Sequence, residues 1–378
     1  MVRVAPTMVG SCLVGRIDSS LGVPLRTENP KGPSIGKRYF FGVFLSLLVM
    51  NLGSAQETNP VANSVTDKPD IAKAIEHLEL PAELVGRIKR GEIVAPPVSD
   101  GSNKELAVRL MMLVRASPDD LKEYITADNL MGKDPTFAAS GELSPDSPKI
   151  EGIKLTEDEA MDYLSAEPGN DFNFHTKEYA KLKAAKKKVK DDKDAPAVAA
   201  HVLSEILLAR LQAYRLAGIG AVAPYDRGDG KFSEPGDELL GAMVVSPILK
   251  NAAPEVYAAF CDFPGSPAPG AIHQFFWSQQ KVEDEPAFIL SHRMTYLGQN
   301  GVIYVDRQYY VSRTYNSMLT GAGCGQLAEG TIIYYVNRTS TDQVAGFMQE
   351  TKHSVGRKQM REELIKMFED IRKRVGKG

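Results

Sequence analysis

The chain has 378 residues, of which 43% are hydrophobic and 25% charged, and its formal net charge is −3. This composition indicates a globular protein of about two domains and excludes a wholly disordered chain, a collagen and a coiled coil. Only one stretch is apolar enough to enter a bilayer, so a polytopic membrane protein is excluded as well. The slightly negative charge argues against a general nucleic-acid binder.

The N-terminal segment has the features of a secretory signal. Residues Tyr39–Met50 carry no charge, Lys37 and Arg38 precede them, and the small residues 53–55 follow. A basic start, a short apolar core and a small-residue exit are typical of a signal peptide, here with an overlong n-region. A membrane anchor, the alternative, needs about 20 apolar residues. We expect cleavage after Ala55, export to the periplasm or beyond, and no stable membrane span afterwards.

Removal of this signal changes the charge and the cysteine content. Residues 1–55 carry six basic and two acidic side chains, so cleavage leaves 323 residues with a net charge of −7. Residues 56–70 are polar and contain proline, as expected of a flexible new N-terminus. Cys261 and Cys324 remain, and in an oxidising compartment they form either one disulfide or two separate thiols.

Residues 71–220 are predicted to form a helical region. Capping-box patterns at 102–105 and 156–159 precede apolar residues, which predicts that a helix starts at each. The strongest helix pattern is 198–217, where apolar residues recur at spacings of three and four before Gly218. The lysine-rich stretch 181–194 is either a patch for an anionic partner or a solvated helix, and its three aspartates favour the second.

Residues 221–270 are rich in glycine, proline and alanine and are predicted to be a joint that contains a short helix near 255–260. Aromatic and β-branched residues then come in short runs typical of strands. We place strands near 272–281, 287–297, 301–318 and 329–338, with reversals at 298–301 and 321–325 that make neighbouring strands antiparallel.

The C-terminal residues form an amphipathic helix pattern whose apolar face includes Met360, Leu364 and Phe368. The expected fold class is therefore α+β. A helical N-terminal region precedes an antiparallel sheet in residues 271–378, and the long C-terminal helix closes that sheet. If the sheet curls, a cavity opens between it and the helix.

Several side chains of this sheet could line such a cavity. His292 shares the more apolar face of its strand, where it is either a hydrogen-bonded core residue or a polar anchor for a ligand. In the strand at 301–318, Arg307 and Tyr310 alternate onto opposite faces. Arg338 could bind an anionic group, whereas Thr341 or Asp342 fits a helix N-cap better. The candidate ligand-binding residues are His292, Arg307, Tyr310, Tyr315 and Arg338.

No metal or cofactor is expected. The six histidines lie far apart in the sequence, and the pair Glu350 and His353 is only part of what a di-iron bundle needs. No phosphate-binding or dinucleotide fingerprint is present. Cys324, between two glycines, is either an exposed nucleophile or an ordinary hairpin cysteine.

Four stretches resemble an uncharacterised family of exported bacterial proteins: 210–215 (RLQAYR), 223–227 (APYDR), 307–312 (RQYYVS) with 315–317 (YNS), and 337–346 (NRTSTDQVAG). The resemblance covers most of the mature chain and implies export and a shared fold, but it implies no activity. The order of elements over residues 255–375 also resembles the helix-grip fold of START-like lipid-binding domains, which is a likeness of fold alone.

Three functions remain open on the sequence alone. The first is an exported protein that binds a lipid or another amphipathic small molecule between sheet and helix. The second is an envelope interaction or scaffold protein without catalysis. The third is an enzyme that uses a cleft between the two parts, with Arg215, Tyr225, Asp226, Arg227 and His292 as candidates.

Overall fold

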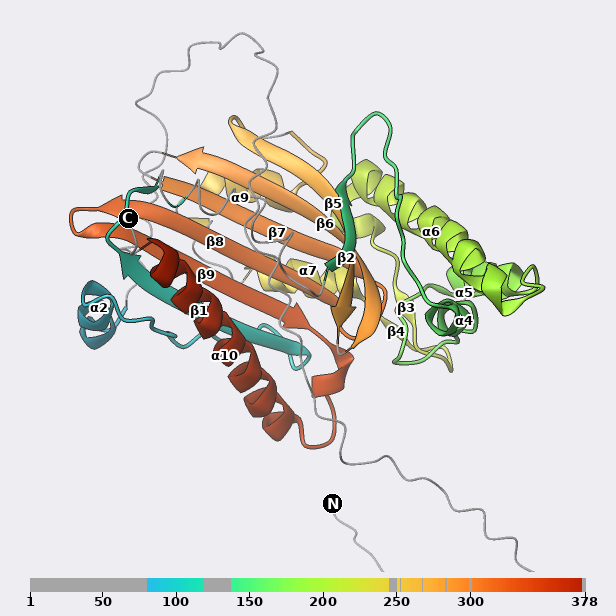
Figure 1. The fold of residues 1–378 in the computed structure, drawn as a ribbon. Helices are drawn as coiled ribbons and strands as arrows, with labels where there is room; N and C mark the ends of the chain where they lie inside the picture. The colour runs from blue at the N-terminus through green and yellow to red at the C-terminus, as the bar shows by residue number, and fades with distance from the viewer. Residues whose placement is uncertain are drawn as a thin grey trace, which may run out of the picture. The chain divides into compact units, whose positions relative to one another are not determined.

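A seven-stranded antiparallel sheet is the largest element of the structure, a computed structural model that describes residues 80–118, 121, 137–244, 250–251, 253–266, 268–282, 284–298 and 301–375. The strand order is β1-β9-β8-β7-β6-β5-β2 (Figure 1). The strands are β1 (Glu105–Val114), β2 (Phe137–Glu142), β5 (Ala271–Val282), β6 (Glu285–Gly298), β7 (Gly301–Val311), β8 (Ser317–Leu327) and β9 (Gly330–Ser340).

The strands β5 to β9 form a meander in which each strand pairs with the next. The predicted α+β class is confirmed in this respect, since a large antiparallel sheet precedes the C-terminal helix α10 (Gln349–Val375). The strands predicted near 272–281, 287–297 and 329–338 are present as β5, β6 and β9.

The prediction for residues 301–325 was wrong in two places. The expected strand 301–318 is interrupted after Val311, and the chain turns through Thr314, whose φ is 78°. Residues 321–325, expected to be a reversal, lie inside β8. The reversal comes later, at Gly330, where a Cβ would lie 2.3 Å from the carbonyl oxygen of Val114, so only glycine fits there.

The region predicted to be helical, 71–220, also supplies both edge strands of the sheet. In place of a helix after the capping-box pattern at 102–105, β1 pairs with β9 from Glu105↔Ser340 to Val114↔Thr331. Apolar side chains on both of its faces explain this. Leu106 and its alternate neighbours face α10, and Met111 faces the other side, so a strand buries more of them than a helix would.

Three helices predicted elsewhere from local signals are present. Thr156 caps α4 (Glu157–Leu164) with a complete capping box. The helix α6 (Ala195–Ala217) ends at Gly218, whose φ is 62°. The short helix predicted near 255–260 is α9 (Pro254–Cys261). The lysine-rich stretch 181–194 begins within α5 (Thr176–Lys186) and runs to the 3₁₀ turn η1 (Asp192–Asp194), and most of its side chains are exposed.

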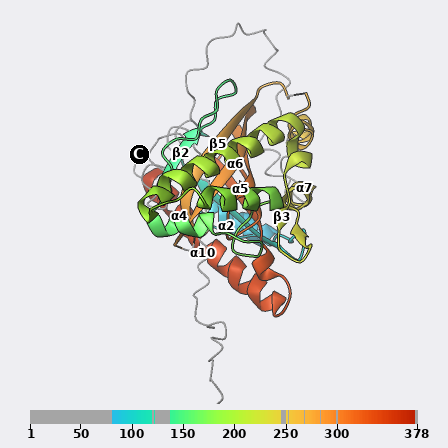
Figure 2. The same ribbon diagram turned by 90° about the vertical axis from the view of Figure 1, so that its right-hand side faces the viewer.

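The two faces of the sheet are covered by different helices. Along β9, Tyr334 and Val336 belong to a core shared with α4, α5, α6, α9 and α7 (Pro235–Val244). The alternate residue Tyr335 belongs to a second core shared with α10. Figure 1 shows α10 in front of the sheet and α7 and α9 behind it. Figure 2, turned by 90°, shows α4, α5 and α6 on the side that faces the viewer.

The remaining elements are α2 (Ala82–Lys89), η2 (Gly218–Ala221), the hairpin of β3 (Tyr225–Asp226) and β4 (Phe232–Ser233), and η3 (Asp342–Val344). Thr341 accepts a hydrogen bond from the backbone of Gln343 at the start of η3, which is the capping role predicted for it. All described residues belong to one compact unit, Tyr39–Gly378, so the predicted joint at 221–270 does not divide them into two bodies.

The predicted signal peptide (1–55) and the following segment 56–70 lie outside the described residues. Within the part of the chain that the structure describes, no helix is both long enough and apolar enough to cross a membrane.

Candidate binding site

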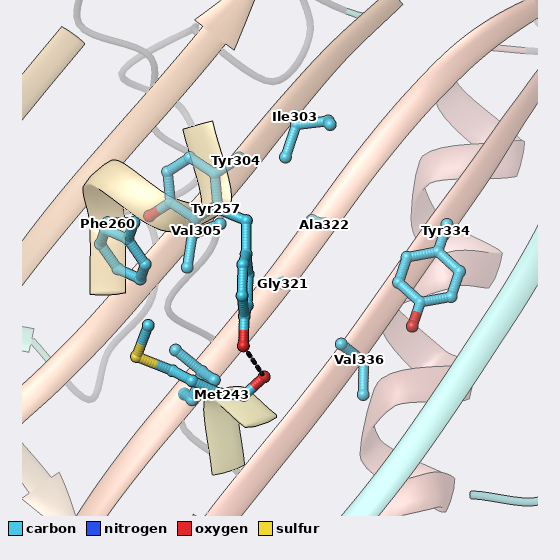
Figure 3. Close-up of a pocket in the computed structure, with 11 residues that line it drawn as sticks. Met243, Tyr257, Phe260, Ile303, Tyr304, Val305, Gly321, Ala322, Tyr334 and Val336 are labelled. Atoms are coloured by element: carbon cyan, nitrogen blue, oxygen red, sulfur yellow. Dashed lines mark hydrogen bonds between the residues drawn. The ribbon is translucent and has the colours of Figure 1, made fainter. Parts of the chain in front are cut away.

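A small apolar pocket lies between the sheet and the helices α7 and α9 (Figure 3). The helices contribute Met243, Tyr257 and Phe260, and the hydroxyl of Tyr257 donates a hydrogen bond to the backbone oxygen of Met243 at 3.4 Å. The strands contribute Ile303, Tyr304, Val305, Leu319, Gly321, Ala322, Tyr334 and Val336. The cavity measures about 40 Å³, which is room for roughly three water molecules or a short aliphatic group.

Local sequence explains why the pocket forms here. Pro254 begins α9 at a position where a missing N–H has no cost, and acidic residues occupy the first turns of both α7 and α9. Opposite these helices, Gly321 presents no side chain. A Cβ at this position would lie 3.2 Å from Cγ1 of Val336, so the glycine leaves the space open.

A buried arginine lies at the helical side of this pocket. Arg307 is fully buried, and its Nη2 donates to the sulfur of Met243 at 2.8 Å and to the carbonyl oxygen of Phe260 at 2.9 Å. Its guanidinium lies 4.0 Å from the centroid of the Phe260 ring. Its Nη1 donates to the hydroxyl oxygen of Tyr214 at 2.7 Å, and its Nε has no hydrogen-bond partner among the residues that the structure describes. Two pocket residues, Met243 and Phe260, therefore contact this cation directly.

The hydrogen-bond chain continues from Arg307 through two histidines. Tyr214 and Nδ1 of His292 are 2.9 Å apart, and Nε2 of His292 and Nδ1 of His273 are 2.8 Å apart. Because Arg307 already donates to the Tyr214 oxygen, we assign the Tyr214 hydroxyl as donor to His292 and the His292 Nε2–H as donor to His273. Burial, with the nearby charge of Arg307, lowers the pKa of His292 well below its usual value, so this ring is neutral.

A bulge in β7 determines which side chains reach this network. Leu290 pairs with Tyr310 and Ser291 pairs with Gln308, which leaves Tyr309 as an extra residue. Tyr309 and Tyr310 both face the helical layer as a result, so the expected strict alternation of Arg307 and Tyr310 onto opposite faces was wrong. Tyr309 stacks on Tyr214 at 3.8 Å between ring centroids, and Arg210 lies 4.1 Å from the Tyr310 ring.

The structure brings together only some of the predicted ligand-binding residues. His292 and Arg307 share the network beside the pocket, whereas Tyr310 packs under Arg210. The hydroxyl of Tyr315 donates to Gln308, and Tyr315 belongs to a separate small core. Arg338 donates to Glu105 at 3.0 Å, and both side chains are almost fully buried.

The residues of the alternative cleft have structural partners. Arg227 pairs with Asp342 at 2.9 Å and lies 5.4 Å from the ring of Tyr225, its neighbour in the β3–β4 hairpin. Asp226 accepts from Thr176 at 2.6 Å. Arg215 instead donates to the backbone oxygen of Leu143 at 2.6 Å, in the loop after β2.

Sequence reasoning missed a carboxylate next to that hairpin, Glu238 on α7. It accepts from Asn316 at 2.9 Å and lies 3.9 Å from Lys104, which pairs with Asp342 at 2.7 Å. Burial is the main cause that raises the pKa of Glu238 to about 7. No helix was predicted from the sequence at the position of α7, and the burial of Glu238 depends on contacts with residues distant in the sequence.

The cysteines and metal ligands give no further site. Cys261 on α9 and Cys324 on β8 are separate thiols, so no disulfide joins them. Among the described residues, no three His, Cys, Asp or Glu side chains are grouped so that they could hold a metal ion.

Sequence reasoning also missed the pocket residues Met243, Tyr257 and Phe260. The helix that carries Tyr257 and Phe260 was predicted, but nothing in its own residues indicated which face of the sheet it covers.

No family model, curated protein or solved structure matches this chain.

Proposed function

We propose that this protein binds a small, mainly apolar ligand in the pocket between the sheet and the helices α7 and α9. The observation that carries the proposal is the pocket itself, since its walls are largely aliphatic and aromatic and a buried polar network adjoins it. Concave apolar sites with a few fixed polar groups are the usual form of small-molecule sites.

The sequence placed the ligand between the sheet and the C-terminal helix, as in a helix-grip fold. Packing favours the opposite face. A Cβ added at Gly356 of α10 would lie 2.7 Å from Cδ1 of Leu106, so helix and strand are already in close contact there. The α10 face is filled by side chains such as Met360, Leu364 and Phe368. We therefore assign α10 a structural role.

Export remains part of the proposal, on the strength of the signal-like residues before Gln56. It determines the compartment in which the ligand is encountered and has no bearing on the geometry of the pocket. The N-terminal sequence of the mature protein tests it, because cleavage after Ala55 leaves Gln56 as the first residue.

The binding proposal is tested by filling the pocket with one methyl group. Gly321→Ala adds a Cβ on the pocket side of β8, and its nearest contact is Cγ1 of Val336 at 3.2 Å. We expect the dissociation constants of 1-propanol and 1-butanol, measured by NMR titration, to rise by about tenfold or more. The melting temperature should change little, because the crowding of Val336 is offset by the smaller conformational freedom of alanine in the unfolded chain.

Cys324→Ala is the matched control, since it lies on the same strand but packs in the α10 core. It should leave the dissociation constants within about twofold of the wild-type values. Equal affinities for the wild type and Gly321→Ala, or no saturable binding by the wild type, would contradict the proposal.

A further inference from the structure

We propose that the ligand of this pocket carries a carboxylate and that Arg307 binds it. This inference rests on the proposed function and specifies the chemical class of the ligand. It makes the protein a binder of short-chain aliphatic acids.

Arg307 lacks a counter-charge among the described residues. Five arginine side chains are buried among the described residues, and four of them have a carboxylate at ion-pair distance. These pairs are Arg210–Glu178 at 2.6 Å, Arg293–Asp306 at 3.6 Å, Arg313–Asp162 at 3.1 Å and Arg338–Glu105 at 3.0 Å. Arg307, the most deeply buried of the five, has polar or ring contacts in the described part of the chain with a hydroxyl, a carbonyl, a thioether and an aromatic ring, and with no carboxylate. A buried charge is costly unless it is paired, so an anion from outside fits this position.

The described residues of the hydrogen-bond network beside Arg307 carry no negative charge. Tyr214 donates its proton to His292, and burial raises the pKa of its phenol, so the hydroxyl stays neutral. His292 and His273 are imidazoles whose pKa values are lowered, mainly by burial, and they are neutral too. The charge of Arg307 therefore stays uncompensated by the residues to which it is bonded.

One edge of the Arg307 guanidinium is suited to a carboxylate. Nε and Nη2 form one edge of the planar guanidinium, and a carboxylate can bind such an edge with both oxygens. On this edge Nε has no partner, and one of the acceptors of Nη2 is the sulfur of Met243. A thioether is a weak acceptor on a flexible side chain, so a carboxylate oxygen can displace it. Because Met243 also lines the pocket (Figure 3) and contacts Arg307, its movement would open a path from the pocket to Arg307.

The size of the cavity limits the apolar part of the acid. A cavity of about 40 Å³ holds roughly the bulk of three water molecules, which is close to that of three or four methylene groups. Butyrate therefore suits the pocket, and 1-butanol and butyramide are its matched neutral analogues.

The test compares these three compounds on the full-length protein by calorimetry at pH 7. With the wild type, we expect butyrate to bind roughly 10- to 100-fold more tightly than butyramide or 1-butanol, as charge-assisted hydrogen bonds predict. Arg307→Met should remove this preference while 1-butanol still binds. Arg307→Lys should keep part of the preference, since it retains the charge without the fork. Arg361→Met, on the exposed surface of α10, is the control and should change nothing.

The wild-type comparison needs no variant, so the inference remains testable even if Arg307→Met does not fold. If 1-butanol binds and is weakened by Gly321→Ala, but butyrate binds no better, the carboxylate inference is wrong and the proposed function stands. If none of the three compounds binds, both are wrong.

Discussion

Arg307 and Glu238 depart from the ordinary behaviour of charged side chains in a folded protein. Among the described residues, Arg307 has only neutral hydrogen-bond partners, which is the basis of the ligand assignment. Glu238 accepts hydrogen bonds from Asn316 and Ser317, but its burial outweighs them and its pKa rises to about 7. Each departure has a measurable consequence.

For Glu238 the consequence is a dependence of stability on pH. Its folded-state pKa lies above the ordinary value of 4.5, so between about pH 4.5 and 7 the folded state binds more protons than the unfolded state. Its contribution to the free energy of unfolding therefore falls as pH rises through this window. We expect Glu238→Gln to be more stable than the wild type at pH 8 by roughly 1 to 3 kcal/mol, and this gain should disappear near pH 4.5.

Urea unfolding of both proteins at several pH values measures this difference. The free energy of unfolding of the variant is compared with that of the wild type at each pH, because His273 and His292 also make stability depend on pH. Their pKa values are lowered, so below about pH 6.5 they make both proteins more stable as pH rises. Glu234→Gln, an exposed neighbour, is the control and should show no such trend. A gain that is constant with pH, or that grows toward low pH, would contradict the assignment of Glu238.

Single residues were predictable from the sequence only as far as local pattern allows. Alternation along its strand placed His292 on the apolar face; it is fully buried, but on the face that packs against α6 and α9 and not on the α10 side predicted for the ligand. Its partner Tyr214 belongs to α6, far away in the sequence, so no local pattern could pair them. The bulge at Tyr309 depends on the register between β6 and β7, which is likewise a property of two strands together.

At the scale of elements, helices with their own start and stop signals were predictable, whereas β1 was not. The capping box of Thr156 and the terminal Gly218 act within a few residues of the helices they limit. A similar pattern at 102–105 precedes β1, but its Glu105 pairs instead with Arg338 of β9. Whether residues 105–114 form a strand or a helix therefore depends on pairing with β9, which lies far away in the sequence.

The helix α10 has a structural role that can be tested separately from ligand binding. Leu364 is fully buried in the core between α10 and β1. Leu364→Ala should lower the free energy of unfolding by about 2 to 5 kcal/mol, as large-to-small changes in a core do. Because the pocket lies on the other face, the affinity for 1-butanol should stay within about twofold of the wild-type value.

Glu362→Ala, exposed on the same helix, is the control for unfolding and should have little effect. If Leu364→Ala stays folded but loses ligand affinity by tenfold or more, the ligand lies beneath α10 and our placement is wrong.

At the scale of the whole molecule, the sequence predicted the α+β class and the antiparallel pairing of neighbouring strands, but it predicted four strands where the meander has five, because β8 was not recognised as a strand. It did not predict that residues 71–220 supply both edges of the sheet, nor which face each helix covers. Those features follow from long-range packing, and packing also placed the pocket opposite α10.

The placement of the ligand is tested most directly by methyl NMR spectroscopy of the full-length protein titrated with butyrate. We predict saturable shifts in the methyl signals of Ile303, Val305 and Leu319, which line the pocket. The signals of Leu106, Leu364 and Ile371, in the core beneath α10, should not move. Shifts confined to this second group, or no saturable shifts at all, would contradict the account.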